Sequence, residues 1–488
     1  MRRTKIVCTI GPASSSVADL DRLVAAGMDV ARLNFSHGTH AEHAEVIQRL
    51  RDGEKRWGRP IAVLQDLQGP KIRLGTFGPN GGGRVDLEGG KPFTLTAAPV
   101  AGTEERASLS PAEVLAQVRA GDQILMDDGM IQLRVEEASP EEVRCRVVQG
   151  GRISDHKGVS LPHVPLPISC LTDKDREDLK FGIEHGVDFI AVSFVRSASD
   201  IIDVKRSLLD LGTDVPIVAK LERQEAMKNL PGILASVDAV MVARGDLGLD
   251  VPIEDVPHIQ KEIIRQARAW KVPVIVATQM LESMVTHLRP TRAEVSDVAN
   301  AIFDGADAIM LSAETATGGH PVEAVQVMAR IAERAEASTV RAEVAYERPR
   351  TVALGGEANG VRDTVGFPEA VADAAANAAR VLRAHAIVAF TQSGFSARLI
   401  SHERPDVPII ALTPIVDVQR RLALCWGVSS RVIRKVETTD EMIEEIEATL
   451  LGDGSVAVGD VIIIISGAPM WVTGTTNLLK LHRVGERR

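Results

Sequence analysis

Eight short apolar runs, separated by amphipathic segments, constrain the fold of this 488-residue chain more than any other feature. Each run is nearly continuous in valine, isoleucine, alanine and methionine, as expected for a parallel strand covered on both faces. The segments between the runs have helical periodicity. Eight strand–helix units are the number that closes a (β/α)8 barrel, so the sequence predicts a TIM barrel. The predicted strands are Lys5–Ile10, Val30–Leu33, Ile61–Asp66, Asp188–Val192, Pro216–Lys220, Ala239–Ala243, Pro273–Thr278 and Ala308–Leu311.

One interval breaks this alternation. The residues between the third and fourth strands are rich in glycine and in short β-like runs, which predicts a small β-barrel lid domain inserted on two hinges. Beyond a polar linker, helices and strands alternate again, which predicts an open α/β domain at the C-terminus. The expected domains are the barrel over 1–69 and 166–340, the lid over 70–165, and a regulatory domain over 341–488.

Charge and composition exclude several classes of function. Acidic residues outnumber basic ones by 66 to 56, giving a formal net charge of −10. Bulk attraction to nucleic acid or to an anionic membrane surface is therefore not expected. The longest aliphatic run, Val461–Ile465, is too short to span a bilayer, and the apolar stretch behind the basic start is too brief for an export signal. Four cysteines without a Cys-x-x-Cys pair indicate reduced structural thiols in a cytoplasm.

Polar side chains gather where the predicted barrel strands end, which is where TIM barrels carry their function. Glu222 and Asp246 end neighbouring strands, and two carboxylates suit Mg²⁺, which commonly takes only one or two from a protein. Lys220 points to the same side of its strand as Glu222, where its charge can stabilise a phosphoryl group in transfer. Arg32 and Arg73 can hold phosphate oxygens bidentately. The alternative is that these are surface charges, with Lys220 in a structural ion pair to Glu222.

Several long motifs in this chain resemble those of the pyruvate kinase family. They lie at Ala31–Gly38, Ile217–Glu222, Met241–Gly248, Ala277–Met284 and Arg289–Thr315, and the match covers essentially the whole chain. The resemblance implies transfer of the phosphoryl group of phosphoenolpyruvate to ADP, giving pyruvate and ATP in glycolysis. It also implies Mg²⁺ or Mn²⁺ as cofactor, a cytoplasmic location and a homotetramer.

The resemblance assigns roles to individual residues. The catalytic residues it implies are Arg32, Arg73, Lys220 and Thr278. The residues implied to bind phosphoenolpyruvate are Arg32, Ser193, Lys220, Gly245, Asp246 and Thr278. The metal ligands would be Glu222 and Asp246. The residues implied to contact the nucleotide are Asn34, His37 and Arg73 and, from the lid, Asp128 and Lys157.

The stretch after Asp66 departs from the common pattern of the family. Where many members read Asp-Thr-Lys-Gly-Pro-Glu-Ile-Arg, this chain reads Asp-Leu-Gln-Gly-Pro-Lys-Ile-Arg, so Lys71 replaces a glutamate. In the family a bound K⁺ sits near Asn34, Ser36 and Asp66, beside the substrate phosphate. A lysine ammonium is also a compact monovalent cation, so Lys71 in that pocket predicts activity without K⁺, unless it is only a solvated hinge residue. The residues that resemble the K⁺-independent branch of the family are Leu67, Gln68, Lys71 and Leu74.

Hydroxyls and a glycine follow the predicted strand Ile387–Phe390, and such a strand-to-helix turn suits a phosphate group. The resemblance implies an effector site here for a sugar phosphate or a nucleoside monophosphate, whereas the alternative is simple capping of the next helix. The residues of this predicted site are Thr391, Ser393, Gly394, Phe395 and Ser396, with Thr475 on a facing loop.

Two other classes of function remain as alternatives. A carbon–carbon lyase with a related barrel also uses a Glu/Asp metal pair, but it would lack the lid with Lys157 and this C-terminal domain. A catalytically inactive regulatory protein would have no need to retain Lys220, Glu222, Asp246 and Thr278 together.

Overall fold

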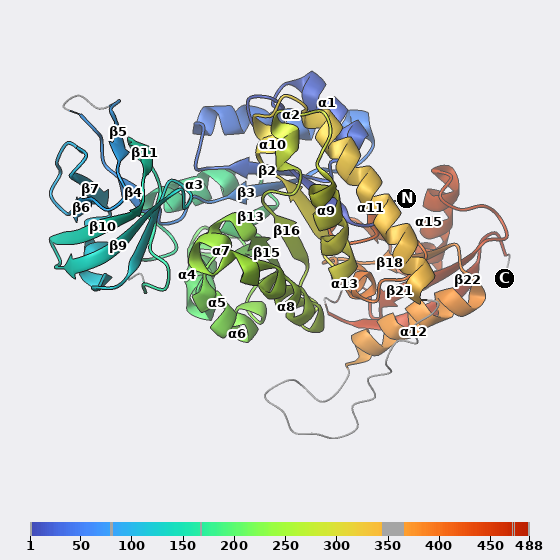
Figure 1. Cartoon of the computed structure of the whole chain (residues 1–488). Helices are drawn as coiled ribbons and strands as arrows, with labels where there is room; N and C mark the ends of the chain where they lie inside the picture. The colour runs from blue at the N-terminus through green and yellow to red at the C-terminus, as the bar shows by residue number, and fades with distance from the viewer. Residues whose placement is uncertain are drawn as a thin grey trace. The chain divides into compact units, whose positions relative to one another are not determined.

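The computed structural model describes residues 2–78, 82–165, 168–343, 366–470, 472 and 474–486. Eight parallel strands close into a barrel (Figure 1) in the order β1-β17-β16-β15-β14-β13-β3-β2. The predicted TIM barrel is confirmed, and each strand begins and ends within one residue of its prediction. The strands are β1 (Lys5–Thr9), β2 (Val30–Asn34), β3 (Ala62–Asp66), β13 (Phe189–Val192), β14 (Ile217–Leu221), β15 (Ala239–Ala243), β16 (Val274–Ala277) and β17 (Ala308–Leu311).

Several of the helices between these strands begin at residues whose side chains cap them, as Ser16, Thr39 and Thr291 do. The hydroxyl of Thr172 likewise accepts a hydrogen bond from the Asp175 N–H at 3.1 Å. The Asp175 carboxylate in turn accepts the Thr172 N–H at 2.9 Å, so two N–H groups that helix bonds leave unused are satisfied. The longer helices are α1 (Val17–Ala26), α2 (His40–Trp57), α3 (Asp173–Glu184), α4 (Ala198–Asp210), α8 (Val256–Ala269), α9 (Arg292–Asp304) and α11 (Pro321–Glu343). The shorter ones are α5 (Gln224–Lys228), α6 (Leu230–Leu234), α7 (Arg244–Asp250) and α10 (Ala313–Ala316).

The chain divides into two compact units. One comprises Met1–Gln65, Glu184–Ile190 and Ile264–Arg488, and the other comprises Asp66–Ile183 and Ala191–Ile263. The strands β14 and β15 belong wholly to the second unit, together with the insert. The C-terminal domain belongs to the first unit.

The insert is a small β domain, as predicted. A seven-stranded sheet runs in the order β12-β8-β9-β10-β6-β7-β4, beside a two-stranded ladder of β11 and β5. Apolar and polar residues alternate along β10, because one face of the sheet covers a core and the other faces water. The strands are β4 (Arg73–Leu74), β5 (Arg84–Leu87), β6 (Pro92–Thr96), β7 (Arg106–Ser110), β8 (Gln123–Met126), β9 (Ile131–Ala138), β10 (Glu142–Gln149), β11 (Gly151–Ser154) and β12 (Val159–Ser160).

The C-terminal part is an open α/β domain, as predicted, with strand order β20-β19-β18-β21-β22. The last strand pairs antiparallel at the edge of the sheet and is the one that the sequence prediction missed. The elements are α12 (Phe367–Leu382), β18 (Ala386–Phe390), α13 (Phe395–His402), β19 (Ile409–Thr413), α14 (Val416–Arg421), β20 (Val428–Val432), α15 (Thr439–Gly452), β21 (Val461–Gly467) and β22 (Thr476–Arg483).

Parts of three predicted connections lie outside the described residues: 79–81 in a loop of the insert, 166–167 at its exit, and 344–365 of the linker. Among the helices that are described, none is long and apolar enough to cross a membrane. The four cysteines are buried and form no disulfide bonds, as predicted.

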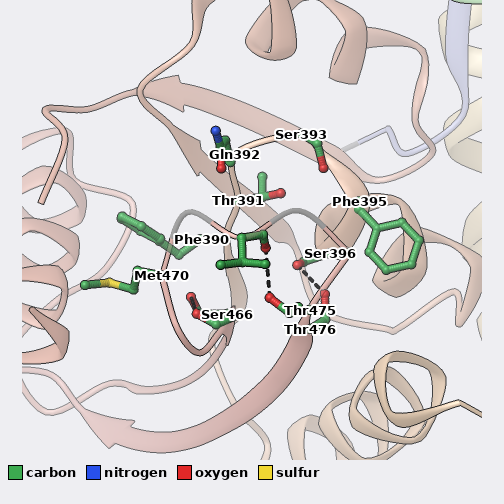
Figure 2. A pocket seen from close by; sticks show the side chains of 13 residues that line it. Phe390, Thr391, Gln392, Ser393, Phe395, Ser396, Ser466, Met470, Thr475 and Thr476 are labelled. Atoms are coloured by element: carbon green, nitrogen blue, oxygen red, sulfur yellow. Dashed lines mark hydrogen bonds between the residues drawn. The ribbon is translucent and has the colours of Figure 1, made fainter. Parts of the chain in front are cut away.

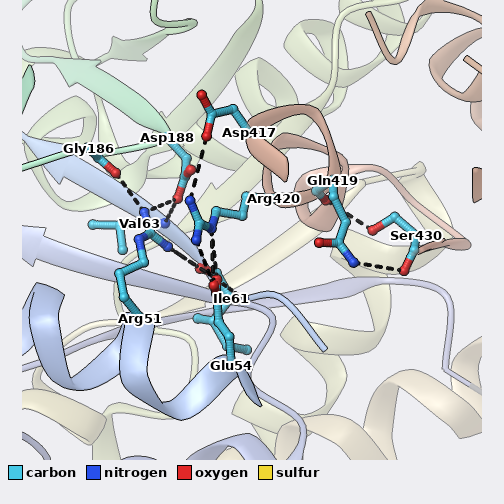
Figure 3. A network of polar contacts seen from close by, with 10 residues as sticks. All are labelled: Arg51, Glu54, Ile61, Val63, Gly186, Asp188, Asp417, Gln419, Arg420 and Ser430. Carbon is cyan, nitrogen blue, oxygen red and sulfur yellow. Dashed lines mark hydrogen bonds and ion pairs between the residues drawn. The ribbon is translucent and has the colours of Figure 1, made fainter. Parts of the chain in front are cut away.

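A network of ion pairs within the first unit joins helix α2 to the start of β13 and to α14 (Figure 3). Arg51 lies 2.8 Å from the buried Asp188 carboxylate, which also accepts the Val63 N–H at 2.7 Å. One turn along α2, Glu54 accepts three hydrogen bonds from Arg420, at 2.7, 2.9 and 3.2 Å. Burial raises the pKa of Asp188, and the charge of Arg51 opposes that increase.

Substituting Arg51 by methionine is expected to lower the free energy of unfolding by about 3 kcal/mol or more, because it leaves the buried Asp188 without its cation. Arg206→Met is the matched control, since the Arg206–Asp203 pair is exposed and worth at most about 1 kcal/mol. Thermal unfolding followed by circular dichroism compares the two variants. Equal midpoints would show that the Arg51–Asp188 pair adds nothing to stability.

Candidate functional site

The side chain of Lys220, on β14, lies among the polar groups at the ends of three barrel strands. Its ammonium is 2.9 Å from Glu222 Oε1 and 3.2 Å from Asp66 Oδ1, and it donates a hydrogen bond of 2.7 Å to Ser193 Oγ. Glu222 and Asp66 are each only 1% exposed. One ammonium therefore faces two buried carboxylates, which leaves this group with a net negative charge.

Ser193 fixes the direction of the Lys220 side chain. The serine hydroxyl donates to the Leu67 carbonyl at 2.8 Å, so its lone pairs are left to accept from the ammonium. The Leu67 N–H bonds the Ala191 carbonyl at 3.0 Å, which ties the end of β3 to the end of β13. Gly69, at φ +68°, lies so close to Ser193 that an added Cβ would come within 2.8 Å of the serine Cβ. The chain thus needs glycine here to bring the insert's entry against the site.

Glu222 and Asp246 have the chemistry of a divalent-metal pair. Burial raises the pKa of the Glu222 carboxyl to about 7. The positive charge of Lys220 opposes this increase, and the negative charge of Asp246 adds to it. A cation that balances both carboxylates would relieve this unfavourable burial. The second oxygen of Glu222 accepts the Phe194 N–H at 2.8 Å.

Within the described ranges, no cluster of three or more histidine, cysteine, aspartate or glutamate residues could hold a metal. Two carboxylates are nevertheless sufficient for Mg²⁺, whose other positions go to substrate and water. The donor set therefore fits Mg²⁺ or Mn²⁺, and it lacks the thiolate and imidazole ligands that zinc prefers.

Lys71, at the entry of the insert, lies within the electrostatic field of this group. Burial lowers the pKa of its ammonium, as do the positive charges of Arg73 and Lys220, whereas Asp246 and Asp66 raise it. Lys71 is half-buried, so it differs from a solvated hinge lysine.

The predicted nucleotide contacts from the insert are partly brought together. Arg73 donates to the His156 carbonyl at 3.2 Å, and the neighbouring Leu74 N–H bonds the Lys157 carbonyl at 3.0 Å. The Lys157 ammonium pairs with Asp127 at 2.7 Å, while Asp128 follows in a turn in which both aspartates have positive φ.

The other predicted residues belong to the first unit. On β2, Arg32 donates to the Thr9 hydroxyl at 2.8 Å. In the turn that follows, the Asn34 side-chain oxygen accepts the Ser36 N–H at 3.1 Å, and the His37 N–H bonds the Asn34 carbonyl at 3.2 Å. These bonds hold Asn34 and Ser36 next to each other in the turn after β2.

Thr278 follows β16 with φ +70°, and Gln279 also has positive φ. The Thr278 hydroxyl donates to the Ala277 carbonyl at 2.6 Å. Just beyond, the fully buried Glu314 accepts the Leu281 and Ser312 N–H groups at 3.0 and 2.7 Å, which fixes the loop that carries Thr278. Glu314 lies in α10, just after the end of β17, and no sequence motif indicated this supporting role.

Of the predicted effector residues, all except Gly394 line one small pocket (Figure 2) between the β18–α13 turn and the loop before β22. Ser396 and Thr476 share a hydrogen bond of 2.6 Å, and the Gly394 N–H bonds the Thr391 hydroxyl at 3.0 Å. The Gln392 side-chain oxygen is buried and has no hydrogen-bond partner among the described residues. The free volume is about 30 Å³, which admits little more than water.

Known proteins similar to this chain share one description. The family model "Pyruvate kinase, barrel domain" matches residues 1–325, and "Pyruvate kinase, alpha/beta domain" matches residues 369–482. Pyruvate kinase 2 of Synechocystis sp. is 45% identical over 485 residues, covering 99% of this chain and 79% of that protein. The Mycobacterium tuberculosis pyruvate kinase is 43% identical, covering 99% of each. The solved pyruvate kinase structure from Cryptosporidium parvum, 33% identical, superposes with a TM-score of 0.89 over 99% of this chain and 96% of that one.

Proposed function

The chain belongs to the pyruvate kinase family, and from that membership we propose which of its residues transfer the phosphoryl group of phosphoenolpyruvate to ADP. The protein is a phosphotransferase, and its family implies phosphoenolpyruvate, ADP, ATP and pyruvate as substrates and products. These are metabolites of glycolysis, which supports a cytoplasmic location.

The observation that carries the proposal is the Lys220 ammonium, held at 2.7 Å from Ser193 and 2.9 Å from Glu222. In our proposal this ammonium moves from the carboxylates to the phosphoryl oxygens, whose charge is shared between donor and acceptor in the transition state. Arg32 and Arg73 would bind the same phosphate, and the backbone at Gly245 would bind the substrate carboxylate. The hydroxyl of Thr278 would help to deliver the proton that converts enolpyruvate to pyruvate.

Glu222 and Asp246 would hold Mg²⁺ or Mn²⁺. When bound, the ion supplies positive charge that neutralises the carboxylates and polarises the substrate oxygens. Two observations support this assignment: burial raises the pKa of Glu222, and the negative charge of Asp246 raises it further.

The residues that would contact the nucleotide are Asn34 and His37 of the barrel and Arg73, Asp128 and Lys157 of the insert. Closure of the lid excludes water, so the phosphoryl group passes to ADP instead of being hydrolysed.

We propose the domain boundaries given above: barrel 1–69 and 166–340, lid 70–165 and regulatory domain 341–488.

We also propose that Lys71 takes the place of K⁺. The monovalent-cation pocket would comprise Asn34, Ser36, Asp66, Leu67 and Lys71. The electrostatic influence of Asp66 and Lys220 on the Lys71 ammonium supports a position beside the reacting phosphate.

One coupled assay tests the main function: phosphoenolpyruvate and ADP are mixed with the enzyme and Mg²⁺, and pyruvate and ATP are measured together. We expect the two products in equal amounts. A lyase would form no ATP, and an inactive regulatory protein would form neither product, so each of these outcomes would overturn the proposal.

The pocket at the β18–α13 turn would bind a phosphorylated effector, a sugar phosphate or a nucleoside monophosphate, and a homotetramer would transmit the signal. The unpaired oxygen of Gln392 supports a ligand that carries hydrogen-bond donors as well as phosphate. Because the free volume is small, the loop that carries Thr475 would have to move outward when the effector binds.

Thr475→Asp is expected to weaken effector binding at least about tenfold, because the new carboxylate repels the phosphate. Asparagine has the shape of aspartate but no charge, so Thr475→Asn is the matched control. It should bind the effector nearly as tightly as the unmodified protein does. Isothermal calorimetry with glucose 6-phosphate and AMP as probes measures both. Absence of heat with either probe, together with hyperbolic kinetics, would count against the site.

A further inference from the structure

The residue after Glu222 connects the metal pair to the exit of the lid. Arg223 is only 7% exposed, and its guanidinium is bonded to the backbone of residues 161–164. It donates to the Val164 carbonyl at 3.0 Å and to the Leu161 carbonyl at 3.4 Å. A buried guanidinium that binds two main-chain carbonyls fixes the course of that segment.

Asp250 makes the matching connection from the other metal ligand. It is the last residue of α7, one turn after Asp246, and its buried carboxylate lies 3.2 Å from Arg223. The same carboxylate accepts the Gln224 N–H at 2.6 Å and the His163 N–H at 3.4 Å. The two segments that follow the metal ligands therefore meet at one ion pair, and both bind the lid's exit.

The exit segment is also part of the lid itself. The side chains of Leu161 and Val164 are buried in the lid's hydrophobic core, together with Phe77, Phe93 and Leu133. Their side chains are therefore packed into the lid and move with it, while their carbonyls accept hydrogen bonds from Arg223. The lid cannot turn about its exit without displacing Arg223, whose neighbour along the chain is Glu222.

We infer that Arg223 and Asp250 are positioning residues that couple the lid's exit to the metal pair, so that a divalent ion on Glu222 and Asp246 restrains the lid. The inference rests on the proposed metal role of these two carboxylates. It extends that role, because the ion would then act on lid position as well as on substrate charge. This coupling is reciprocal. If the bound ion stabilises the lid's exit, a substitution that disrupts the exit weakens binding of the ion by the same coupling free energy.

Hydrogen exchange of residues 158–165, with and without Mn²⁺ and in the absence of nucleotide, tests the coupling in the full-length protein. In the unmodified protein Mn²⁺ is expected to slow exchange there on the order of tenfold. In Arg223→Met this slowing should be lost, and calorimetry should show Mn²⁺ binding weakened by a similar factor. Asp250→Asn and Arg223→Lys retain part of the hydrogen bonding, so they replace Arg223→Met if that variant unfolds. In them we expect the slowing of exchange and the Mn²⁺ affinity to be partly lost.

Arg176→Met, in the same unit, is the control. The Arg176 side chain is exposed and bonds the Ser207 hydroxyl, so its replacement should leave both measurements unchanged. Steady-state kinetics provide a second readout: the KM for ADP should rise in Arg223→Lys more than kcat falls. If Mn²⁺ binding is unaffected by Glu222→Gln, the metal assignment fails and the coupling with it. If Mn²⁺ binds through Glu222 but the exchange of 158–165 is the same with and without the ion, the coupling alone is wrong.

Discussion

Lys220→Met is expected to reduce phosphoryl transfer by about three to five orders of magnitude, the size of effect known for a cation that stabilises a transferring phosphoryl group. Methionine has a similar length but no charge, so the main loss falls on the transition state, where the phosphoryl oxygens carry shared charge. The fold should persist, because Glu222 has a pKa raised to about 7 and can take up a proton when its cation is removed.

Turnover is measured with saturating phosphoenolpyruvate, ADP and Mg²⁺, and circular dichroism verifies the fold. Lys174→Met is the matched control: this lysine is half exposed and pairs with Asp178 on α3, so its removal should leave turnover nearly unchanged. Turnover of Lys220→Met within tenfold of the unmodified enzyme would remove Lys220 from the mechanism.

Lys71→Glu is expected to lower activity without K⁺ by about two orders of magnitude or more, and added K⁺ should restore part of it. The substitution changes the local charge by two units, and one unit charge at 4 Å is worth about 4 kcal/mol at an effective dielectric constant of 20. The unmodified enzyme should be fully active with Mg²⁺ alone, because its lysine already supplies the positive charge.

The measurement compares initial rates in tetramethylammonium buffer with and without K⁺ at constant ionic strength. Lys71→Gln separates loss of the ammonium from introduction of the carboxylate. Its initial rate without K⁺ should lie between those of the unmodified enzyme and Lys71→Glu. Strong activation of the unmodified enzyme by K⁺ would contradict the proposal that Lys71 replaces the ion.

The barrel could be predicted from sequence because its strands are buried on both faces and therefore read as unbroken apolar runs. Strand β22 could not, because it lies at a sheet edge where Asn477, Lys480 and His482 interrupt the apolar residues. The shortest strands of the lid, β4 and β12, are hard to predict for a different reason: they have only two residues each, and their pairing partners are distant in sequence.

The group around Lys220 was also predictable, since strand ends in a closed barrel meet at one rim. What the sequence could not provide is backbone conformation at residues with positive φ. Phe194, Thr278 and Asp128 all adopt this conformation without being glycine, so no residue type announced it. The pairing of Lys157 with Asp127 depends on such a turn, and only the folded chain reveals it.

The closure of the barrel by its first and last strands also governs how the chain is made. β1 pairs with β17, and the Arg3 and Thr4 N–H groups bond the Glu336 carboxylate, so the beginning of the chain is completed by residues synthesised long afterwards. Until β17 has left the ribosome, one edge of an apolar strand stays open. Open strand edges recruit other chains, and nascent proteins are exposed to this risk for as long as synthesis lasts. Aggregation through the open edge of β1, and the need for chaperones to prevent it, should therefore fall when the eighth strand emerges.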